Sequence, residues 1–137
     1  MVQLIVGVKG KGKTKVLLDK VNSQIQAVEG NIVYLDKSTK HRYELNNKIR
    51  LINMAEYPVK NVDTFLGFIL GIISQDNDLQ QMYLDSFLEI ANLVNEDITE
   101  TVQKLEEISK EFGVDFTLSV SLDTVPEAIK GNVEASL

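Results

Sequence analysis

Eight residues near the start of the chain, Gly7 to Thr14, combine three glycines, three lysines and a threonine hydroxyl. Glycines let the backbone turn so that successive N–H groups point at one bound anion. Lys13 is a flexible positive charge that can reach the outer phosphates of a nucleotide, and the hydroxyl of Thr14 can bind Mg²⁺. The segment matches G-x-x-x-x-G-K-[ST] at every fixed position, and it predicts a phosphate-binding loop. The expected contacts with the nucleotide are Gly7, Val8, Lys9, Gly10, Lys11, Gly12, Lys13, Thr14 and Lys15.

The residues on either side of this loop have the patterns that such a loop requires. Val2 to Val6 is a short apolar run of strand length that leads directly into the first glycine. After the loop, apolar residues recur at helical spacing at Leu17, Val21, Ile25 and Val28, and Gly30 is placed to end the helix. The N-terminus of this helix favours the same anion as the loop does.

Two acidic residues that follow apolar runs are candidates for holding Mg²⁺ opposite Thr14. Asp85 ends the apolar segment Met82 to Asp85, and its carboxylate would hold the metal through water. Asp36 ends the strand predicted from Asn31 to Asp36 and is the competing candidate. We rank Asp36 lower because the strand after the first helix usually lies farther from the loop.

The order of the predicted elements indicates a three-layer α/β/α fold with a mainly parallel sheet. Strands alternate with helices over residues 1–137, and the length suits a single nucleotide-binding domain. Right-handed crossovers place the carboxyl ends of parallel strands at one edge of the sheet. We therefore expect Asp36, Asp85 and Ser119 or Ser121, from the alternating segment Val114 to Ser121, to lie beside the loop.

The segment after the second predicted strand allows two interpretations. His41 to Leu45 and Ile49 to Asn53 are short runs separated by Asn46-Asn47-Lys48, and asparagine tolerates positive φ. We therefore expect a β-hairpin insertion at this place. The alternative is that the second run joins the main parallel sheet. The hairpin region 37–48 is polar and basic, so it would be an acceptor lid, a partner surface or an exposed surface hairpin.

Several predictions concern the second half of the chain. Phe65 to Ser74 is apolar almost all round and predicts a core helix, because it is too short to span a membrane. Asn95 is expected to begin a further helix that ends at Gly113. The tail from Gly131 to Leu137 shows no pattern, so we expect it to be frayed.

Composition and charge narrow the function classes. The chain has a net charge of −6, 44% apolar residues, no cysteine and one histidine, so thiolate and histidine-based metal centres are disfavoured and a cytoplasmic protein is expected. Residues 1–60 carry 11 basic and 5 acidic side chains, whereas residues 61–137 carry 3 basic and 15 acidic ones. The basic half surrounds the predicted anion site and is too small for a nucleic-acid footprint, and no membrane partner is indicated.

The loop GVKGKGKT and the segment MYLDS resemble those of P-loop NTPases, and the order of elements is similar to the RecA-like and AAA-like branch. More narrowly, the chain resembles short P-loop proteins labelled as relatives of the twitching-motility ATPase. The resemblance implies catalytic roles for Lys13 and Asp85, and for Ser121 (or, less well, Ser119) as a sensor of the γ-phosphate. Ser86 follows Asp85 where that branch often has a water-polarising glutamate.

This departure leaves the identity of a catalytic acid open. Glu44 and Glu56 are the remaining candidates, since Glu89 lies a residue or more too far along to replace the missing glutamate simply. The only arginines, Arg42 and Arg50, would have to supply any arginine finger unless another subunit does.

Three functions are consistent with these residues. The first is Mg²⁺-dependent binding of a nucleoside triphosphate, favouring ATP, with slow hydrolysis. The others are a non-hydrolysing nucleotide switch and a phosphotransferase acting on a small acceptor. A protein partner or a homo-oligomer is compatible with each of them.

Overall fold

A six-stranded sheet, in which every neighbouring pair of strands is parallel, organises the computed structural model, which describes residues 1–137. The strands are β1 (Val2–Val6), β2 (Asn31–Asp36), β3 (Arg50–Asn53), β4 (Leu79–Leu84), β5 (Asp115–Val120) and β6 (Val133–Ser136). Their order across the sheet is β3-β2-β4-β5-β1-β6. The strand that leads into the loop, β1, is thus separated from β4 by β5 alone.

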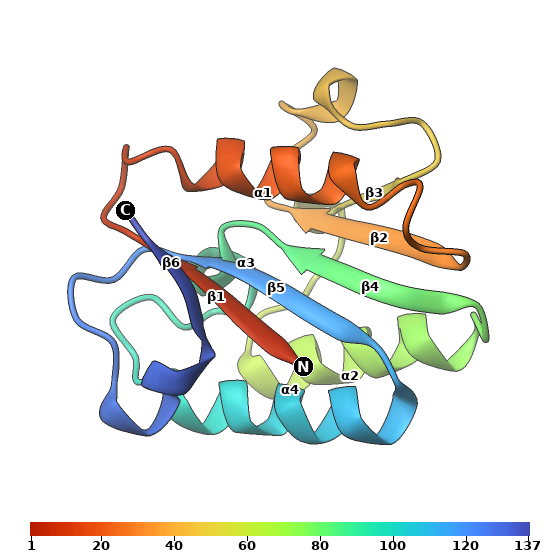
Figure 1. Ribbon diagram of the computed structural model, residues 1–137. Helices are drawn as coiled ribbons and strands as arrows, with labels where there is room; N and C mark the ends of the chain where they lie inside the picture. The colour runs from red at the N-terminus through yellow and green to blue at the C-terminus, as the bar shows by residue number, and fades with distance from the viewer.

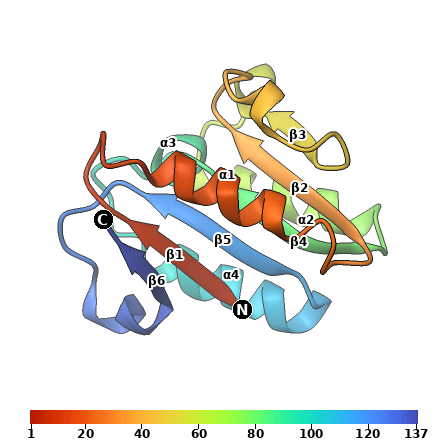
Figure 2. The ribbon, with the colours of Figure 1, turned by 45° about the horizontal axis from the view of Figure 1, so that its top comes forward.

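Helices cover both faces of this sheet, which makes the molecule three-layered (Figure 1). The helix that follows the loop, α1 (Lys13–Ser23), lies alone on one face, where Leu17, Leu18 and Val21 are buried. The longer helices α2 (Val62–Ser74) and α4 (Thr99–Phe112) cover the other face. Figure 2 shows α1 running across the middle strands, with its N-terminus at the carboxyl edge of the sheet. The predicted α/β/α fold with a parallel sheet is confirmed.

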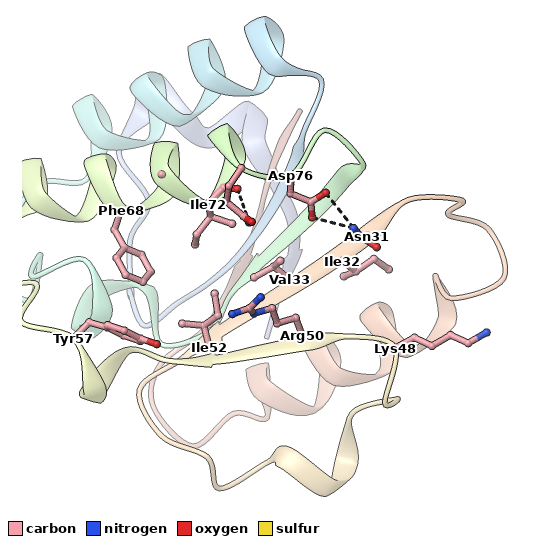
Figure 3. Close-up of a pocket in the computed structure, with 12 residues that line it drawn as sticks. Asn31, Ile32, Val33, Lys48, Arg50, Ile52, Tyr57, Phe68, Ile72 and Asp76 are labelled. Carbon is pink, nitrogen blue, oxygen red and sulfur yellow. Dashed lines mark hydrogen bonds between the residues drawn. The ribbon is translucent and has the colours of Figure 1, made fainter.

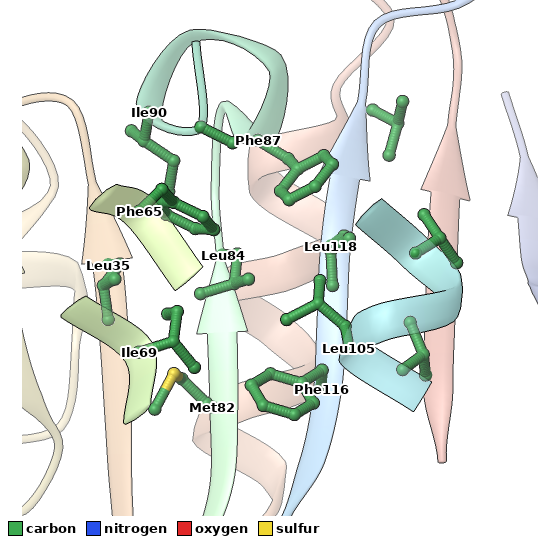
Figure 4. Packing of buried hydrophobic residues seen from close by; sticks show 14 of the residues in the cluster. Leu35, Phe65, Ile69, Met82, Leu84, Phe87, Ile90, Leu105, Phe116 and Leu118 are labelled. Carbon is green, nitrogen blue, oxygen red and sulfur yellow. The ribbon is translucent and has the colours of Figure 1, made fainter. Parts of the chain in front are cut away.

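The larger of two apolar clusters lies between the sheet and helices α2 and α4. Figure 4 shows Phe65 and Ile69 of α2 and Leu105 of α4 packed on the inward side chains of β2, β4 and β5. The rings of Phe65 and Phe87 meet edge to face, with centroids 6.1 Å apart. This packing fixes the strand ends that carry the candidate site residues.

The β-hairpin predicted for residues 41–53 is wrong. His41 to Leu45 contains a 3₁₀ turn, η1 (Arg42–Glu44), and β3 pairs in parallel with β2 instead of folding back on its predecessor. The alternative, in which the second run joins the main sheet, is confirmed. The parallel arrangement places Ile52 on the same face as Leu35, its register partner, where both add to the larger cluster. A hairpin would have left these apolar side chains without that core.

The helix α1 is shorter than the apolar spacing predicts, because it ends at Ser23. Side chains at its end bond to backbone groups instead: Ser23 donates to the carbonyl of Lys20 at 2.6 Å, and Asn22 donates to that of Glu44 at 2.8 Å. Gly30 lies in the turn before β2 and does not end the helix. A Cβ atom there would lie 2.0 Å from the carbonyl oxygen of Asp78, so the turn requires a glycine.

The helix α2 begins at Val62, and its N-cap Asn61 accepts a hydrogen bond from the amide of Thr64 at 2.8 Å. Ile69 is fully buried, which confirms the core helix, but Gly67, Leu70 and Gly71 form an exposed stripe along it. No helix in the structure has the length and apolar character needed to cross a membrane.

Two further expectations in the second half were wrong, and one helix was missed. The helix α4 begins at Thr99, whose amide bonds Asp97, while Asn95 lies in a turn with φ of 64°. The short helix α3 (Phe87–Ile90), which follows β4, was not predicted. The tail is not frayed: after the 3₁₀ helix η3 (Glu127–Asn132) it forms β6, which pairs in parallel with β1.

Candidate functional site

A cavity of about 600 Å³ lies at the carboxyl edge of the sheet, around the N-terminus of α1. The loop after β1, the ends of β2, β4 and β5, and the helix α3 contribute to its walls. Lysines and acids alternate around it: the cations are Lys9, Lys13, Lys37 and Lys40, and the acids are Asp36, Asp85, Glu89 and Glu96. We refer to it below as the loop cavity. Its volume lies in the range of small-molecule sites, which is about 300–1,000 Å³.

The loop reaches this cavity through two backbone positions that favour glycine. Gly10 and Gly12 have φ values of 87° and 89°, and Gly12 stands directly before the first residue of α1. A side chain at either position would be strained, because L-residues rarely adopt such angles. The loop consequently ends in a helix N-terminus that points its free N–H groups into the cavity.

Lys13 lies at the centre of the loop, with only 8% of its surface exposed. Its Nζ atom donates a hydrogen bond of 3.1 Å to the carbonyl of Val8, five residues earlier. Burial lowers the pKa of this lysine, and the nearby carboxylate of Asp85 partly opposes that shift. The charge is therefore held inside the loop by a single neutral partner, which a phosphate oxygen can replace.

Asp85, which follows β4, joins the loop to the neighbouring strands through four hydrogen bonds. Its Oδ1 atom accepts from the hydroxyl of Thr14 at 3.2 Å, from the hydroxyl of Ser119 at 2.6 Å and from the amide of Ser86 at 2.9 Å. Its Oδ2 atom accepts from the hydroxyl of Tyr34 at 2.7 Å. With 2% exposure, this carboxylate is a buried charge that its partners fully satisfy.

Tyr34 is a site residue that sequence reasoning missed. It is fully buried on β2, and its ring stacks on that of Tyr83 with centroids 6.3 Å apart. One feature of the sequence could have indicated Tyr34: alternate residues of a strand share a face, so Tyr34 lies on the same face of β2 as the candidate acid Asp36. Burial and the adjacent Asp85 carboxylate both raise the pKa of the Tyr34 hydroxyl, so it remains a hydrogen-bond donor.

Asp36 also lines the loop cavity, but its environment differs from that of Asp85. Its carboxylate accepts one hydrogen bond, from the amide of Lys37 at 2.7 Å, and 3% of the residue is exposed. Burial, followed by repulsion from Asp85, raises the pKa of Asp36 from 3.8 to about 6. Asp36 thus has a raised proton affinity and, with one donor, unused acceptor capacity.

The structure brings together only part of the predicted loop contacts. The cavity is lined by Lys9, Gly10, Gly12, Lys13 and Thr14, and also by Ser121 and Ser119. Four predicted contacts do not line it: Gly7, Val8, Lys11 and Lys15. Lys15 extends from the first turn of α1 and pairs with Asp19 at 3.2 Å, and Gly7 packs against Leu137 at the end of β6.

The candidates for a catalytic glutamate are also separated by the structure. Neither Glu44 nor Glu56 lines the loop cavity, and Glu44 bonds the Nδ1 atom of His41 at 2.7 Å. Glu89 does line the cavity, where it pairs with Lys37 at 3.1 Å. His41 also lines this cavity, whereas neither arginine does.

The donors at this site suit Mg²⁺ if phosphate and water oxygens complete the coordination. Thr14 and Asp85 offer hard oxygen ligands 3.2 Å apart, and no group of three or more histidines, cysteines or acids could hold a metal by itself. Magnesium keeps several waters and is bound through one or two carboxylates together with substrate phosphates. Because Oδ1 of Asp85 already accepts three hydrogen bonds and Oδ2 accepts one, the carboxylate fits contact with the metal through water.

A crystal structure of a KaiC-like protein from the hyperthermophilic archaeon Pyrococcus horikoshii is similar to this chain. The two share 22% sequence identity with a TM-score of 0.62, and the match covers 95% of this chain and 67% of the other. No protein-family model and no curated protein matches the chain. At this identity the likeness concerns the fold alone: the chain has the α/β fold of a KaiC-like, RecA-type P-loop domain.

Proposed function

We propose that residues 1–137 act as one domain that binds a nucleoside triphosphate, ATP, together with Mg²⁺ in the loop cavity. The observation that carries this proposal is the bonded group of Thr14, Asp85 and Ser119 beside the buried charge of Lys13. A P-loop needs a cation for the phosphates and an oxygen pair for the metal, and both lie at one helix N-terminus. ATP is favoured because the chain lacks the guanine-reading pattern Asn/Thr-Lys-x-Asp.

The residues take distinct parts in this proposal. Backbone amides from Gly10 to Thr14 surround the phosphates, and Lys13 exchanges its bond with Val8 for one with a phosphate oxygen. Thr14 and Asp85 would hold the metal, which neutralises charge on the phosphates when it is bound. Ser121, which is exposed at the cavity, is placed for contact with the terminal phosphate.

We further propose slow hydrolysis of ATP. In this step the carboxylate of Asp36, rather than that of a glutamate, acts as the general base that accepts a proton from the attacking water. Asp85 is held by four hydrogen bonds from the chain, whereas Asp36 lines the cavity with a single donor and a pKa raised to about 6. The oxygen of a water attacks the γ-phosphorus, its proton passes to Asp36, and the bond between the γ-phosphorus and the bridging oxygen breaks to release ADP. A non-hydrolysing switch is the alternative, since no glutamate follows Asp85.

The resemblance to short P-loop proteins labelled as relatives of the twitching-motility ATPase is carried by the same loop and the same strand end. We propose nucleotide binding from these residues and no motor activity, because they contain nothing that acts on a track or a filament.

Isothermal titration of the chain with ATP and Mg²⁺ tests the binding proposal. Lys13→Ala should weaken binding by about tenfold or more, because it removes the charge that faces the phosphates. Lys15→Ala is the matched control, since this lysine is two positions along and pairs with Asp19 outside the cavity. Equal affinities for the parent and Lys13→Ala would contradict the proposal, and an equal preference for GTP would contradict the choice of base.

A measurement of phosphate release from ATP distinguishes slow hydrolysis from a non-hydrolysing nucleotide switch. We expect slow, Mg²⁺-dependent release from the parent and a loss of about tenfold or more in Asp36→Asn, with unchanged ATP affinity. Glu56→Gln, an acid away from the cavity, should keep the parent rate. If the parent releases no phosphate above background while it binds ATP, the chain is a switch and Asp36 has no catalytic part.

A further inference from the structure

A second cavity, of about 750 Å³, lies on the α2 face of the sheet beside the edge strand β3. Its walls come from β2, β3, the loop that carries Tyr57, and the second half of α2 (Figure 3). It shares no lining residue with the loop cavity. We refer to it as the edge cavity. It is a separate place on the molecule for a second kind of ligand.

The edge cavity lies beside β3, where no helix packs directly on the strand and where α2 carries a glycine, Gly71, in place of a larger side chain. Gly71 lines the cavity, and a Cβ atom added there would meet no other atom within 4 Å. The strand itself contributes the partly buried side chain of Ile52, and α2 contributes Phe68 and Ile72. These three side chains pack on the larger core but remain partly open toward the cavity.

One end of the edge cavity is aromatic. The rings of Tyr57 and Phe68 lie with centroids 5.3 Å apart and planes inclined by 50°. Figure 3 shows both rings at the same end, with Ile52 and Ile72 between them and the rest of the cavity. A flat apolar group can pack against such rings and gain both burial and aromatic contact.

The middle of the edge cavity holds a cation without a partner. Figure 3 shows the guanidinium of Arg50 beside Ile52 and Val33, whereas Lys48 extends away from the cavity. The side chain of Arg50 forms no ion pair and no hydrogen bond in the structure. The one acid in the wall, Asp76, is engaged elsewhere, because its oxygens accept from the side chain of Asn31 at 3.0 and 3.1 Å.

An unpaired arginine beside apolar and aromatic side chains selects one class of ligand. The guanidinium of Arg50, which is exposed to solvent, matches a carboxylate with two parallel hydrogen bonds. The volume of about 750 Å³ lies within the range of sites for small molecules, about 300–1,000 Å³, which favours a small-molecule ligand. We propose that the edge cavity binds a small carboxylic acid with an aromatic body, the carboxylate at Arg50 and the ring beside Phe68 and Tyr57.

The probe for this proposal is 4-phenylbutyrate, titrated into the ¹⁵N-labelled full chain while amide shifts are recorded. We expect saturable shifts at residues 50–57 and 68–72 and none in the loop at residues 7–14. The uncharged analogue 4-phenylbutan-1-ol should bind about tenfold more weakly, because it cannot form the charged pair with Arg50.

Two pairs of variants test the named contacts. Arg50→Leu should weaken binding of 4-phenylbutyrate by about tenfold and remove the preference for the acid over the alcohol. Arg42→Leu, on the exposed turn η1, should change neither the affinity nor the preference. Gly71→Leu should fill the cavity and abolish binding of both probes. Gly67→Leu is its control, because it adds the same side chain to the same helix in open space outside the cavity.

The melting temperature of each variant shows that its fold is kept. Absence of saturable shifts in the edge cavity at millimolar 4-phenylbutyrate would overturn the proposal. Equal binding of acid and alcohol, or binding that Arg50→Leu leaves unchanged, would overturn it as well.

Discussion

The two cavities differ in whether their charged side chains find partners within the chain. At the loop cavity, Asp85 accepts four hydrogen bonds from the chain itself, and Lys13 bonds the carbonyl of Val8. At the edge cavity, Arg50 has no partner within the chain. The first site is thus assembled before any ligand arrives, whereas the second depends on its ligand to complete it. Preorganised groups lose less entropy on binding, so we expect tighter and more selective binding at the loop cavity.

The helix α2 separates the core from the edge cavity, and substitutions on its two sides should have opposite consequences. Ile69→Asp should unfold or aggregate the protein, because an unpaired buried carboxylate costs several kcal/mol. That cost is comparable to the whole free energy of unfolding of a domain, which starts at about 5 kcal/mol. Leu70→Asp, the adjacent position with 39% exposure, should change the free energy of unfolding by about 0.5 kcal/mol or less. Thermal unfolding of both variants provides the measurement. A soluble Ile69→Asp with an unchanged melting temperature would show that α2 faces the other way.

Asp36 should make the protein less stable as the pH rises. A raised carboxyl pKa means that the folded protein binds this proton more tightly than the unfolded chain does, so the stability that the group provides is present below about pH 4 and is lost by about pH 6. Asp36→Asn should therefore raise the free energy of unfolding at pH 7 by about 1–2 kcal/mol, less than the full shift implies because the carboxylate opens onto the cavity.

Urea denaturation at pH 4, 6 and 7 checks this expectation. The difference between Asp36→Asn and the parent should be small at pH 4 and should grow toward pH 7. Lower stability of the variant at pH 7 would mean that the ionised carboxylate is favourable in the fold, contrary to the environment described above.

Tyr34 should act as a positioning residue for Asp85. Removing its hydroxyl in Tyr34→Phe leaves the Oδ2 atom of Asp85 without its donor, so the carboxylate is less firmly held against Thr14. We expect the gain in ATP affinity that Mg²⁺ provides to fall by about three- to tenfold, while affinity in chelator is unchanged.

The stacked neighbour offers a matched control for this residue. Tyr83 carries the same hydroxyl on the next strand, but it donates to Gln81 at 2.8 Å and not to Asp85. Tyr83→Phe should keep the whole Mg²⁺ effect, and neither variant should alter binding of 4-phenylbutyrate at the edge cavity. Equal losses in both tyrosine variants would point to a general effect on packing.

The sequence predicted features that depend on local spacing. The loop from Gly7 to Thr14 and the apolar segment that leads to Asp85 each follow from neighbouring residues, and the structure has a loop before α1 and the strand β4 at those places. The parallel sheet followed from the alternation of strands and helices. Each of these patterns depends only on residues that are close together in the sequence.

Features that depend on contacts between distant segments were not predictable in the same way. Asparagines at 46 and 47 suggested a hairpin, but burial of Ile52 against the core favoured a parallel partner for β3. The tail shows no pattern in its sequence, and it forms a strand where it pairs with the outer edge of β1. The bond from Tyr34 to Asp85 required knowledge that β2 and β4 are neighbours, and the edge cavity required knowledge that no helix covers β3.

The pair of acids at the ends of β2 and β4 gives the most direct test of the account. ATP is titrated into Asp85→Asn and Asp36→Asn, each with Mg²⁺ and with chelator. Asp85→Asn should lose the Mg²⁺-dependent gain in affinity and bind magnesium-free ATP as well as the parent or better, because the lost charge otherwise repels the phosphates. Asp36→Asn should keep the Mg²⁺ effect. A loss of that effect in Asp36→Asn, with none in Asp85→Asn, would contradict the assignment of Asp85 and Thr14 as the metal side of the site.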